Sequence, residues 1–276
     1  MGRSATSNSL STKSMFVLML AYIPNSEEIN FAFLKRKKMI RIEHLSKSFN
    51  GQLVLDDISL EIQTGEILVI LGESGTGKTV LLKHMIGLLK PDSGKIWIDG
   101  EEISQLKEKK LLKIRKEIGY LFQEGALYDF MNVFENIAFP LQEHTDFDLR
   151  TIEAKVKHVL EVVDLQGIEK KSPAELSGGM KKRVGLARAI ILDSKIQFCD
   201  EPTSGLDPIR SRDISDLIRN VSKKLNCTTV ITSHDISNAF RIADRLALIR
   251  DGKIIAIGDP DQMKTSSDDF VKAFIQ

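Results

Sequence analysis

The chain contains the sequence Gly72-Glu73-Ser74-Gly75-Thr76-Gly77-Lys78-Thr79, which fits the pattern G-x-x-x-x-G-K-S/T. An apolar run at residues 67–71 precedes it and predicts a short buried strand. Residues 80–89 follow with apolar positions at helical spacing, and Pro91 should end that helix. A strand, a glycine-rich turn and a helix form the context in which this pattern binds nucleotide phosphates. The alternative is a glycine-rich turn with an incidental lysine.

This phosphate-binding loop (P-loop) is expected to hold a nucleotide through its backbone. Glycines let the chain close around phosphate oxygens, and the helix N-terminus adds partial positive charge. Lys78 should reach the β- and γ-phosphates, and the Thr79 hydroxyl should bind Mg²⁺. The predicted ligands are therefore ATP and Mg²⁺. The predicted nucleotide contacts in this segment are Gly72, Glu73, Ser74, Gly75, Thr76, Gly77, Lys78, Thr79 and Val80.

A second, mostly apolar run, residues 195–199, ends in the carboxylates of Asp200 and Glu201. In open α/β sheets the carboxyl ends of the strands face the ligand. Asp200 is expected to hold Mg²⁺ through water, and Glu201 to orient or deprotonate the attacking water. Without the P-loop, a strand followed by an acidic loop would explain this segment as well.

Two more predicted strands end in polar side chains that suit the same edge. Residues 228–233 are rich in β-branched side chains and precede His234, which could donate a hydrogen bond to a γ-phosphate. Residues 118–122 precede Gln123, whose amide can sense Mg²⁺ and water. A surface histidine that caps the next helix and a satisfied loop glutamine are the alternatives. The predicted catalytic residues are Glu201, His234, Lys78 and Gln123, and the predicted metal ligands are Thr79, Gln123 and Asp200.

The sequence Leu176-Ser177-Gly178-Gly179-Met180 lies between these segments and precedes a helix predicted over residues 180–192. Backbone N–H groups of Ser177, Gly178 and Gly179 would open that helix, and a helix N-terminus suits a γ-phosphate. We call residues 176–180 the signature segment.

From about residue 40 to residue 257, the chain resembles the nucleotide-binding subunits of ATP-binding-cassette (ABC) transporters. The matching elements occur in the order typical of that family: Phe49, the P-loop, Gln123, the signature segment, Asp200 and Glu201, the turn at 204–208, and His234. The resemblance implies that two chains sandwich two ATP molecules, each between one chain's P-loop and the other chain's residues 177–179. It also implies that Asp207 communicates across the dimer and that Phe49 stacks on adenine. A core phenylalanine is the alternative for Phe49.

Met180 departs from the commonest family pattern, which has glutamine there, and its thioether donates no hydrogen bond. Together with residues 124–141 and 181–190, this variant is similar to the ATPases of mammalian-cell-entry-type systems, including the machinery that maintains outer-membrane lipid asymmetry. That similarity implies phospholipid as cargo, a membrane permease and a lipid-binding mammalian-cell-entry-domain protein as partners, and a location on the cytoplasmic face of the inner membrane. Lipoprotein release, small-molecule uptake and a soluble ABC ATPase of DNA repair or translation are the alternatives.

The same resemblance predicts where the permease binds. Residues 124–133 contain Leu127, Tyr128, Phe130 and Met131 close together. In the family this region receives a short cytoplasmic helix of the permease, and aromatic residues and methionine are enriched at protein interfaces. Packing inside the domain is the alternative for this cluster.

The whole pattern predicts an α/β fold with a P-loop core of mainly parallel sheet. An antiparallel lobe is expected from residues 39–49, 55–63 and 95–99, and a helical lobe carrying the signature segment from about residues 125–174. A hairpin is expected at 245–257, where Asp251-Gly252 joins two strands. One apolar stripe should pack inside the helical lobe: Leu149, Ile152, Val156, Val159, Leu160 and Val163.

Composition excludes several other classes. The 39 basic and 38 acidic side chains give a net charge of +1, which does not suggest nucleic-acid binding. The two cysteines, Cys199 and Cys227, suggest no disulfide framework. The apolar run at 15–23 is shorter than the ~20 residues of a membrane helix. Residues 1–38 are expected to be a disordered or non-native extension before a domain at 39–276, either an over-extended start or a cleaved transit peptide.

Overall fold

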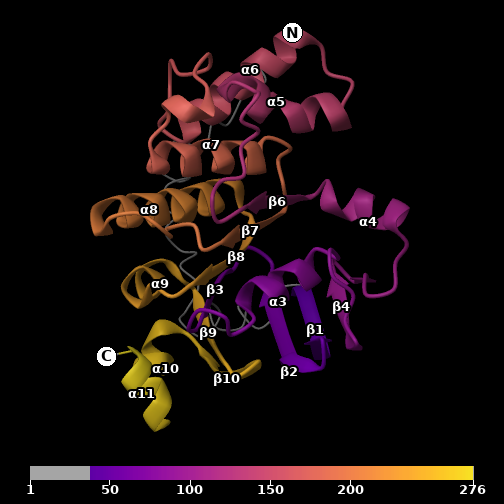
Figure 1. The fold of residues 1–276 in the computed structure, drawn as a ribbon, viewed down its shortest axis with the longest axis vertical. Helices are drawn as coiled ribbons and strands as arrows, with labels where there is room; N and C mark the ends of the chain where they lie inside the picture. The colour runs from indigo at the N-terminus through magenta and orange to yellow at the C-terminus, as the bar shows by residue number, and fades with distance from the viewer. Residues whose placement is uncertain (1–37, 276) are drawn as a thin grey trace, which may run out of the picture. The chain divides into compact units, whose positions relative to one another are not determined.

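The computed structural model describes residues 38–275, which form two sheets with helices around them (Figure 1). The expectations of an extension or a transit peptide fall on residues 1–37, and these lie outside the described residues. Within residues 38–275, no helix combines the length and the apolar character needed to cross a membrane.

The first sheet is antiparallel and has the strand order β2-β1-β4-β5. Alternate residues of its central strand are buried, as for Ile40 and Ile42, because successive side chains of a strand point to opposite faces. The predicted antiparallel lobe is thereby confirmed. The strands are β1 (Lys38–Phe49), β2 (Gln52–Gln63), β4 (Ser93–Ile98) and β5 (Glu101–Glu102).

The second sheet has the order β10-β9-β3-β8-β7-β6. Its strands are parallel except for β10, which closes the predicted hairpin with β9 and runs antiparallel to it. The expected mainly parallel core is thus confirmed. The strands are β3 (Ile67–Leu71), β6 (Ile118–Leu121), β7 (Ile196–Asp200), β8 (Thr228–Ser233), β9 (Arg245–Arg250) and β10 (Lys253–Gly258).

Strand β3 is apolar throughout because both of its faces are covered. Ile67, Val69 and Leu71 belong to one hydrophobic cluster, and Leu68 and Ile70 belong to another. A parallel strand buried on both faces reads as a continuous apolar run rather than an alternating one. The P-loop therefore follows directly after a strand that is buried on both faces.

Helices α5, α6 and α7 pack against one another and lie together at one end of the described residues in Figure 1. Helix α7 contacts β6 as well, so it joins this group of helices to the parallel sheet. A short 3-10 helix, η1 (Pro173–Glu175), precedes the signature segment. The helices are α3 (Lys78–Met85), α4 (Glu108–Arg115), α5 (Val133–His144), α6 (Leu149–Val162), α7 (Gly178–Ile190), α8 (Pro208–Leu225), α9 (Ile236–Ile242), α10 (Pro260–Lys264) and α11 (Asp269–Ile275).

Two helices have boundaries that differ from the prediction. Helix α3 ends at Met85, well before Pro91, because Gly87 takes a left-handed φ of 66° and the N–H of Leu88 donates to the carbonyl of Lys83. That geometry terminates helices. Helix α7 begins at Gly178 instead of residue 180, because Ser177 caps it.

The apolar stripe on α6 is buried as expected except at its first member. Ile152, Val156, Val159, Leu160 and Val163 are buried, whereas Leu149 is 60% exposed. Leu149 is the first residue of α6, directly after the capping Asp148, and the stripe begins to meet the other helices one turn later. The prediction that Leu149 packs in the core is wrong.

Candidate nucleotide site

The P-loop connects the end of β3 to the start of α3. Gly77 precedes the helix with a φ of 98°, a conformation that side chains other than glycine rarely adopt. The ammonium of the buried Lys78 turns back into the loop, where it donates to the carbonyl oxygens of Gly72 (2.8 Å) and Glu73 (2.9 Å). The loop is therefore held in a closed shape by its own lysine.

Asp200 ends β7 and is surrounded by hydroxyl groups. Its Oδ1 accepts hydrogen bonds from Thr79 Oγ1 at 2.8 Å and from Thr232 Oγ1 at 2.7 Å. Its Oδ2 lies 3.4 Å from the hydroxyl of Tyr120, the residue before the last one of β6. Burial and the nearby Asp200 raise the pKa of Tyr120, so this hydroxyl keeps its proton and donates it. Three strands and the P-loop helix thus fix one carboxylate.

Glu201, the next residue, has a left-handed φ of 45°, which is uncommon for a residue with a side chain. Its backbone N–H donates to Thr232 Oγ1 at 3.0 Å, which holds the turn in place. The carboxylate Oε1 lies 3.3 Å from Lys78 Nζ, and Oε2 lies 2.8 Å from His234 Nδ1. The predicted general base therefore stands between the predicted phosphate-binding lysine and the predicted γ-phosphate contact.

Several of these groups line one cavity of about 650 Å³. The P-loop, Gln123, Glu201 and His234, which are far apart in the sequence, all contribute to its wall. Gln123 follows β6, and its Nε2 donates to Ser204 Oγ at 3.1 Å. The lining residues are Val54, Glu73, Ser74, Gly75, Gly77, Lys78, Thr79, Val80, Gln123, Glu201, Ser204 and His234.

Several predicted site residues lie outside this lining: Gly72, Thr76, Asp200, Phe49 and residues 177–179. Phe49 ends β1 and is partly exposed, with the Lys47 ammonium 5.4 Å from the ring centroid. Ser177 caps α7 by accepting a hydrogen bond from the Met180 N–H at 3.3 Å, so Gly178 and Gly179 form the first turn of that helix. Within its own chain, the signature segment does not reach the cavity.

Sequence reasoning missed several residues of this site. Thr232 is fully buried yet polar at the end of β8, and such a residue at the ligand edge of a sheet is a usable signal. Tyr120 and Ser204 gave no such signal, because their importance depends on which segment the fold brings beside them.

Lys182 on α7 was also missed. It is 4% exposed, and its Nζ has no hydrogen-bond partner among the described residues. Burial lowers the pKa of its ammonium, and the carboxylates of Glu124, Glu201 and Asp200 oppose that shift. Lys182 is therefore a buried cation whose charged form is favoured by these three carboxylates.

Donor chemistry at Thr79 and Asp200 fits Mg²⁺. This ion keeps several waters and takes few protein oxygen ligands beside substrate phosphates. The Thr79 hydroxyl at the cavity wall and the carboxylate oxygen of Asp200 2.8 Å from it match that requirement. Within residues 38–275, no group of three or more His, Cys, Asp or Glu side chains could hold a metal alone, so an all-protein metal cage is not what this wall offers.

Comparison with protein-family models matches residues 55–204 to the ABC transporter family. The chain belongs to that family. This ABC chain is 43% identical over 236 residues to a probable ribonucleotide transport ATP-binding protein, mkl, of Mycobacterium leprae, covering 86% of this chain and 68% of the relative. It is 40% identical over 240 residues to MlaF of Haemophilus influenzae, an intermembrane phospholipid transport system ATP-binding protein, covering 87% and 91% of the two chains.

Similarity to solved structures supports the same family assignment. The ABC chain superposes with a TM-score of 0.75 on the ATP-binding cassette MJ0796, seen as a dimer bound to ADP and Pi, at 28% identity over 80% of this chain and 99% of that one. The predicted resemblance, the predicted fold class and the predicted activity are confirmed. The chain is an ATP-binding and ATP-hydrolysing subunit of the ABC transporter type.

Proposed function

We propose that this ABC ATPase drives the movement of phospholipid between membranes. The observation that carries the proposal is the similarity to MlaF, because it spans 91% of that relative and 87% of this chain. The proposed system has a membrane permease and a lipid-binding mammalian-cell-entry-domain protein as partners. The proposed ABC domain covers residues 39–276 and works on the cytoplasmic face of the inner membrane.

In the proposed mechanism, the P-loop N–H groups and Lys78 bind the β- and γ-phosphates of ATP. Thr79 and Asp200 would hold Mg²⁺, which neutralises phosphate charge when bound, with Gln123 beside them. Glu201 takes the proton of the attacking water, and His234 keeps the carboxylate turned toward it through the 2.8 Å contact. Phe49 is proposed to stack on adenine at the edge of the antiparallel sheet.

We further propose that two copies form the ATP sandwich. Residues 177–179 open α7, where N–H groups and the helix dipole favour a phosphate, yet they lie outside their own chain's cavity. A second copy would bring its bound nucleotide to this turn. Asp207 caps α8 and has a lowered pKa because backbone N–H groups of Arg210 and Ile209 bond to it, so it presents a fixed negative charge near the proposed interface.

A groove beside the P-loop core is the proposed permease site. Tyr128 lies in its wall with Phe139 at 5.3 Å between ring centroids, and Arg188 donates to the carbonyls of Gly125 and Ala126 at 2.8 Å. The side chain of Asn136 bonds both to the N–H and to the carbonyl of Tyr128. The loop is therefore held in place before any partner binds.

The aromatic cluster of this loop divides into a packed part and an exposed part. Leu127 packs against the helical core, whereas Phe130 is 81% exposed and Tyr128 is partly exposed. A rigid loop that displays aromatic rings is typical of a binding surface. We propose that a cytoplasmic helix of the permease contacts Tyr128 and Phe130.

A different cargo is the second candidate, and the name of the mycobacterial relative favours it. That protein is described as a ribonucleotide transport ATP-binding protein. The ATPase subunit does not select the cargo in either case, because the permease and its partners contact it. Reconstitution therefore has to include the permease.

The experiment that tests the proposal is affinity purification of this chain from detergent-solubilised membranes, followed by reconstitution with its permease in vesicles. Transfer of labelled phospholipid between vesicles is measured with and without ATP, and the Glu201→Gln variant is the matched control. ATP-dependent transfer by the parent and none by the variant is the expected result. ATP hydrolysis without phospholipid movement, together with nucleoside or nucleotide movement, would favour the second candidate.

A further inference from the structure

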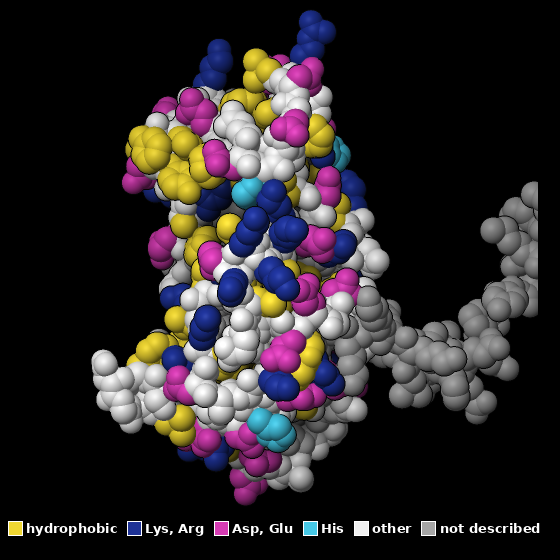
Figure 2. Space-filling view, turned by 90° about the vertical axis from the view of Figure 1, so that its right-hand side faces the viewer, with side chains coloured by type: hydrophobic (Ala, Val, Ile, Leu, Met, Phe, Trp, Pro, Cys, Tyr) yellow, Lys and Arg dark blue, Asp and Glu magenta, His cyan; other side chains and the backbone are white. Residues whose placement is uncertain are grey.

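Helix α4 and its flanks carry an unusual charge pattern. Lys107, Lys109, Lys110, Lys113 and Lys116 are all exposed. Across residues 38–275, none of these five lysines has a carboxylate within ion-pair distance. Figure 2 shows Lys and Arg side chains gathered over the middle of the face on which α4 lies.

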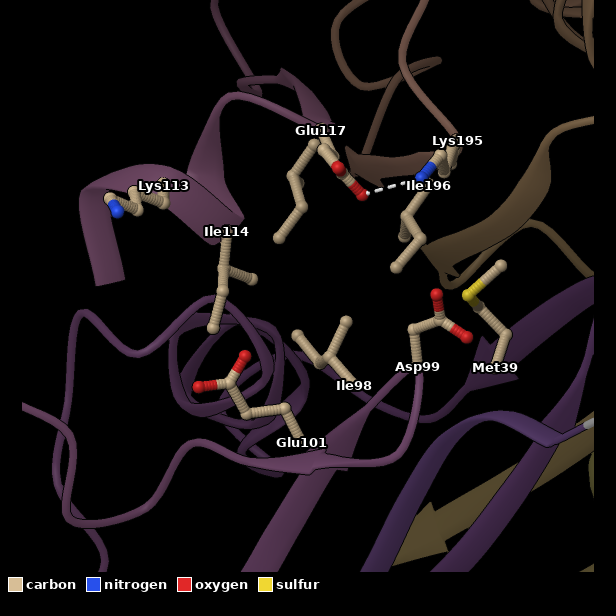
Figure 3. A pocket seen from close by; sticks show the side chains of 10 residues that line it. Met39, Ile98, Asp99, Glu101, Lys113, Ile114, Glu117, Lys195 and Ile196 are labelled. Atoms are coloured by element: carbon tan, nitrogen blue, oxygen red, sulfur yellow. Dashed lines mark hydrogen bonds and ion pairs between the residues drawn. The ribbon is translucent and has the colours of Figure 1, made fainter. Parts of the chain in front are cut away.

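The acidic side chains closest in sequence have other partners. Glu108 pairs with Arg115 at 2.5 Å, and Glu117 pairs with Lys195 at 3.0 Å. Figure 3 shows the Glu117–Lys195 pair at one edge of a pocket that Lys113 also lines. The side chain of Lys113 points away from this pocket. Among residues 38–275, the positive charge of the five lysines is therefore left without a carboxylate partner.

Fold stability does not account for this placement. Lys107 stands at the N-cap without a capping side-chain hydrogen bond, and Lys109 and Lys110 lie in the first turn. Cations are unfavourable at that positive end of a helix. Lys109 and Lys113 are four residues apart on one face, where like charges destabilise a helix. Leu111 is the buried residue of this helix, so α4 gains little packing in return.

Exposed leucines accompany the lysines. Leu112 on α4 and Leu88 after α3 are each 50% exposed. Arg115 donates to the carbonyl of Gly87 at 2.8 Å, which holds Leu88 beside α4. Exposed lysines with exposed leucines beside them are a composition found on surfaces that lie against a membrane.

The position of α4 agrees with such a role. Arg115 and Ile118 line the same groove as Tyr128 and Phe139. If that groove receives the permease, as the proposed function requires, the bilayer that holds the permease lies close to α4. The lysines would then face lipid headgroups.

We propose that α4 docks on anionic phospholipid headgroups of the membrane. Lys107, Lys109, Lys110 and Lys113 line one open depression with Gln105 and Leu106, in which lipid phosphates are accepted. Each lysine near an anionic leaflet strengthens binding by about fivefold, and salt screens the attraction. The contact orients the ATPase under its permease and adds to the protein contacts in the groove.

The test is sedimentation of the full chain with vesicles of phosphatidylcholine alone or of phosphatidylcholine mixed with phosphatidylglycerol. The chain should bind the mixed vesicles and release them as sodium chloride is raised. The triple substitution Lys109→Gln, Lys110→Gln, Lys113→Gln should weaken that binding on the order of a hundredfold, from about fivefold per lysine. ATP hydrolysis by the purified variant should equal that of the parent.

A matched control removes the same charge from other exposed sites: Lys157→Gln, Lys170→Gln and Lys224→Gln. Residues 35–38 are basic too, so only the difference between the two triple variants reports on α4. Equal loss in both variants, or unchanged binding in the α4 variant, would overturn the proposal. So would equal binding to neutral vesicles. The measurement needs neither permease nor cargo, so it is independent of whether phospholipid transport itself is demonstrated.

Discussion

The P-loop and the signature segment are both glycine-rich, but their glycines answer different requirements. A Cβ at Gly72 would lie 2.6 Å from the carbonyl oxygen of Ile249, and Gly77 has a φ of 98°. Neither position accepts a side chain without a shift of the backbone. The glycines of the P-loop are therefore required by the fold of this chain.

The signature glycines meet no such obstacle. A Cβ at Gly178 would meet Leu206 at 3.5 Å, and one at Gly179 would meet Arg210 at 4.0 Å, which are ordinary contacts. Both residues are helical, where glycine is less favourable than alanine. Glycine here costs stability and gains nothing inside the chain. The fold of one chain thus explains the P-loop glycines but not the signature glycines, which supports the proposal that the signature turn serves a second chain.

Glu201→Gln should have the largest effect, because it removes the proposed general base while leaving the P-loop intact. The loss of such a group costs roughly 10²–10⁴-fold in turnover. ATP affinity should stay close to that of the parent. Steady-state hydrolysis and nucleotide titration of the purified variant measure the two quantities. If the variant turns over ATP within about twofold of the parent rate, Glu201 is not the general base.

Lys78→Ala should weaken ATP binding itself, because its ammonium is proposed to bond to phosphates and also holds the loop closed. Hydrogen bonds to charged groups are worth about 1.5–3 kcal/mol, so the Kd should rise roughly ten- to a hundredfold. Lys83→Ala, an exposed lysine of the same helix, is the control and should bind as the parent does. Unchanged affinity in Lys78→Ala would contradict the P-loop assignment.

Mixing two inactive variants tests whether the signature turn works for a second chain. A heterodimer of Lys78→Ala and Ser177→Ala should contain one doubly damaged site and one intact site. The mixture should therefore hydrolyse ATP faster than either variant alone, and the parent rate per chain should rise with concentration. Hydrolysis that is first order in monomer and shows no recovery on mixing would refute the sandwich.

A pair of glycine substitutions tests the comparison directly. Gly72→Ala should destabilise the fold by about 1–3 kcal/mol, as expected for overpacking. Gly179→Ala should stabilise α7 by about 0.5–1 kcal/mol, since alanine is the better helix former, and should still slow hydrolysis in the dimer. Chemical denaturation and ATPase rates measure both. A destabilised Gly179→Ala variant would mean that the glycine serves the chain's own fold.

Substitutions in the groove should have the smallest effect on ATP hydrolysis by the isolated subunit, because the groove is proposed to bind a partner. Phe130→Glu and Tyr128→Glu should reduce capture of the permease while ATP affinity stays unchanged. Phe130 is the more exposed residue, so its variant should keep the parent melting temperature, whereas Tyr128→Glu loses its contact with Phe139 and should melt somewhat earlier. If both variants capture the permease as the parent does, or if Tyr128→Glu unfolds, then Tyr128 and Phe130 pack within the domain and do not bind the permease.

Local patterns were enough to predict the core of this protein. Residues 67–71 are apolar because both faces of β3 are covered, and the glycine-rich turn and helix after them follow from short-range geometry. Asp200, Glu201 and His234 could be predicted because each lies at or just after the end of a strand in the same parallel sheet. Parallel strands bring such ends to one edge, so sequence order alone brings these side chains together.

Other features depend on contacts between distant segments and could not be read from the chain. The hydroxyls of Tyr120 and Thr232 meet at Asp200, and Ser204 meets Gln123, because the strand order β8-β7-β6 places their ends side by side. Leu149 is exposed because no neighbouring helix within residues 38–275 covers the start of α6. That the lysines of α4 and its flanks have no ion pair within residues 38–275 is a property of the folded surface as well, because pairing depends on where each carboxylate lies in space. Periodicity reports which face of an element is apolar, whereas only the packed arrangement of the elements determines what that face meets.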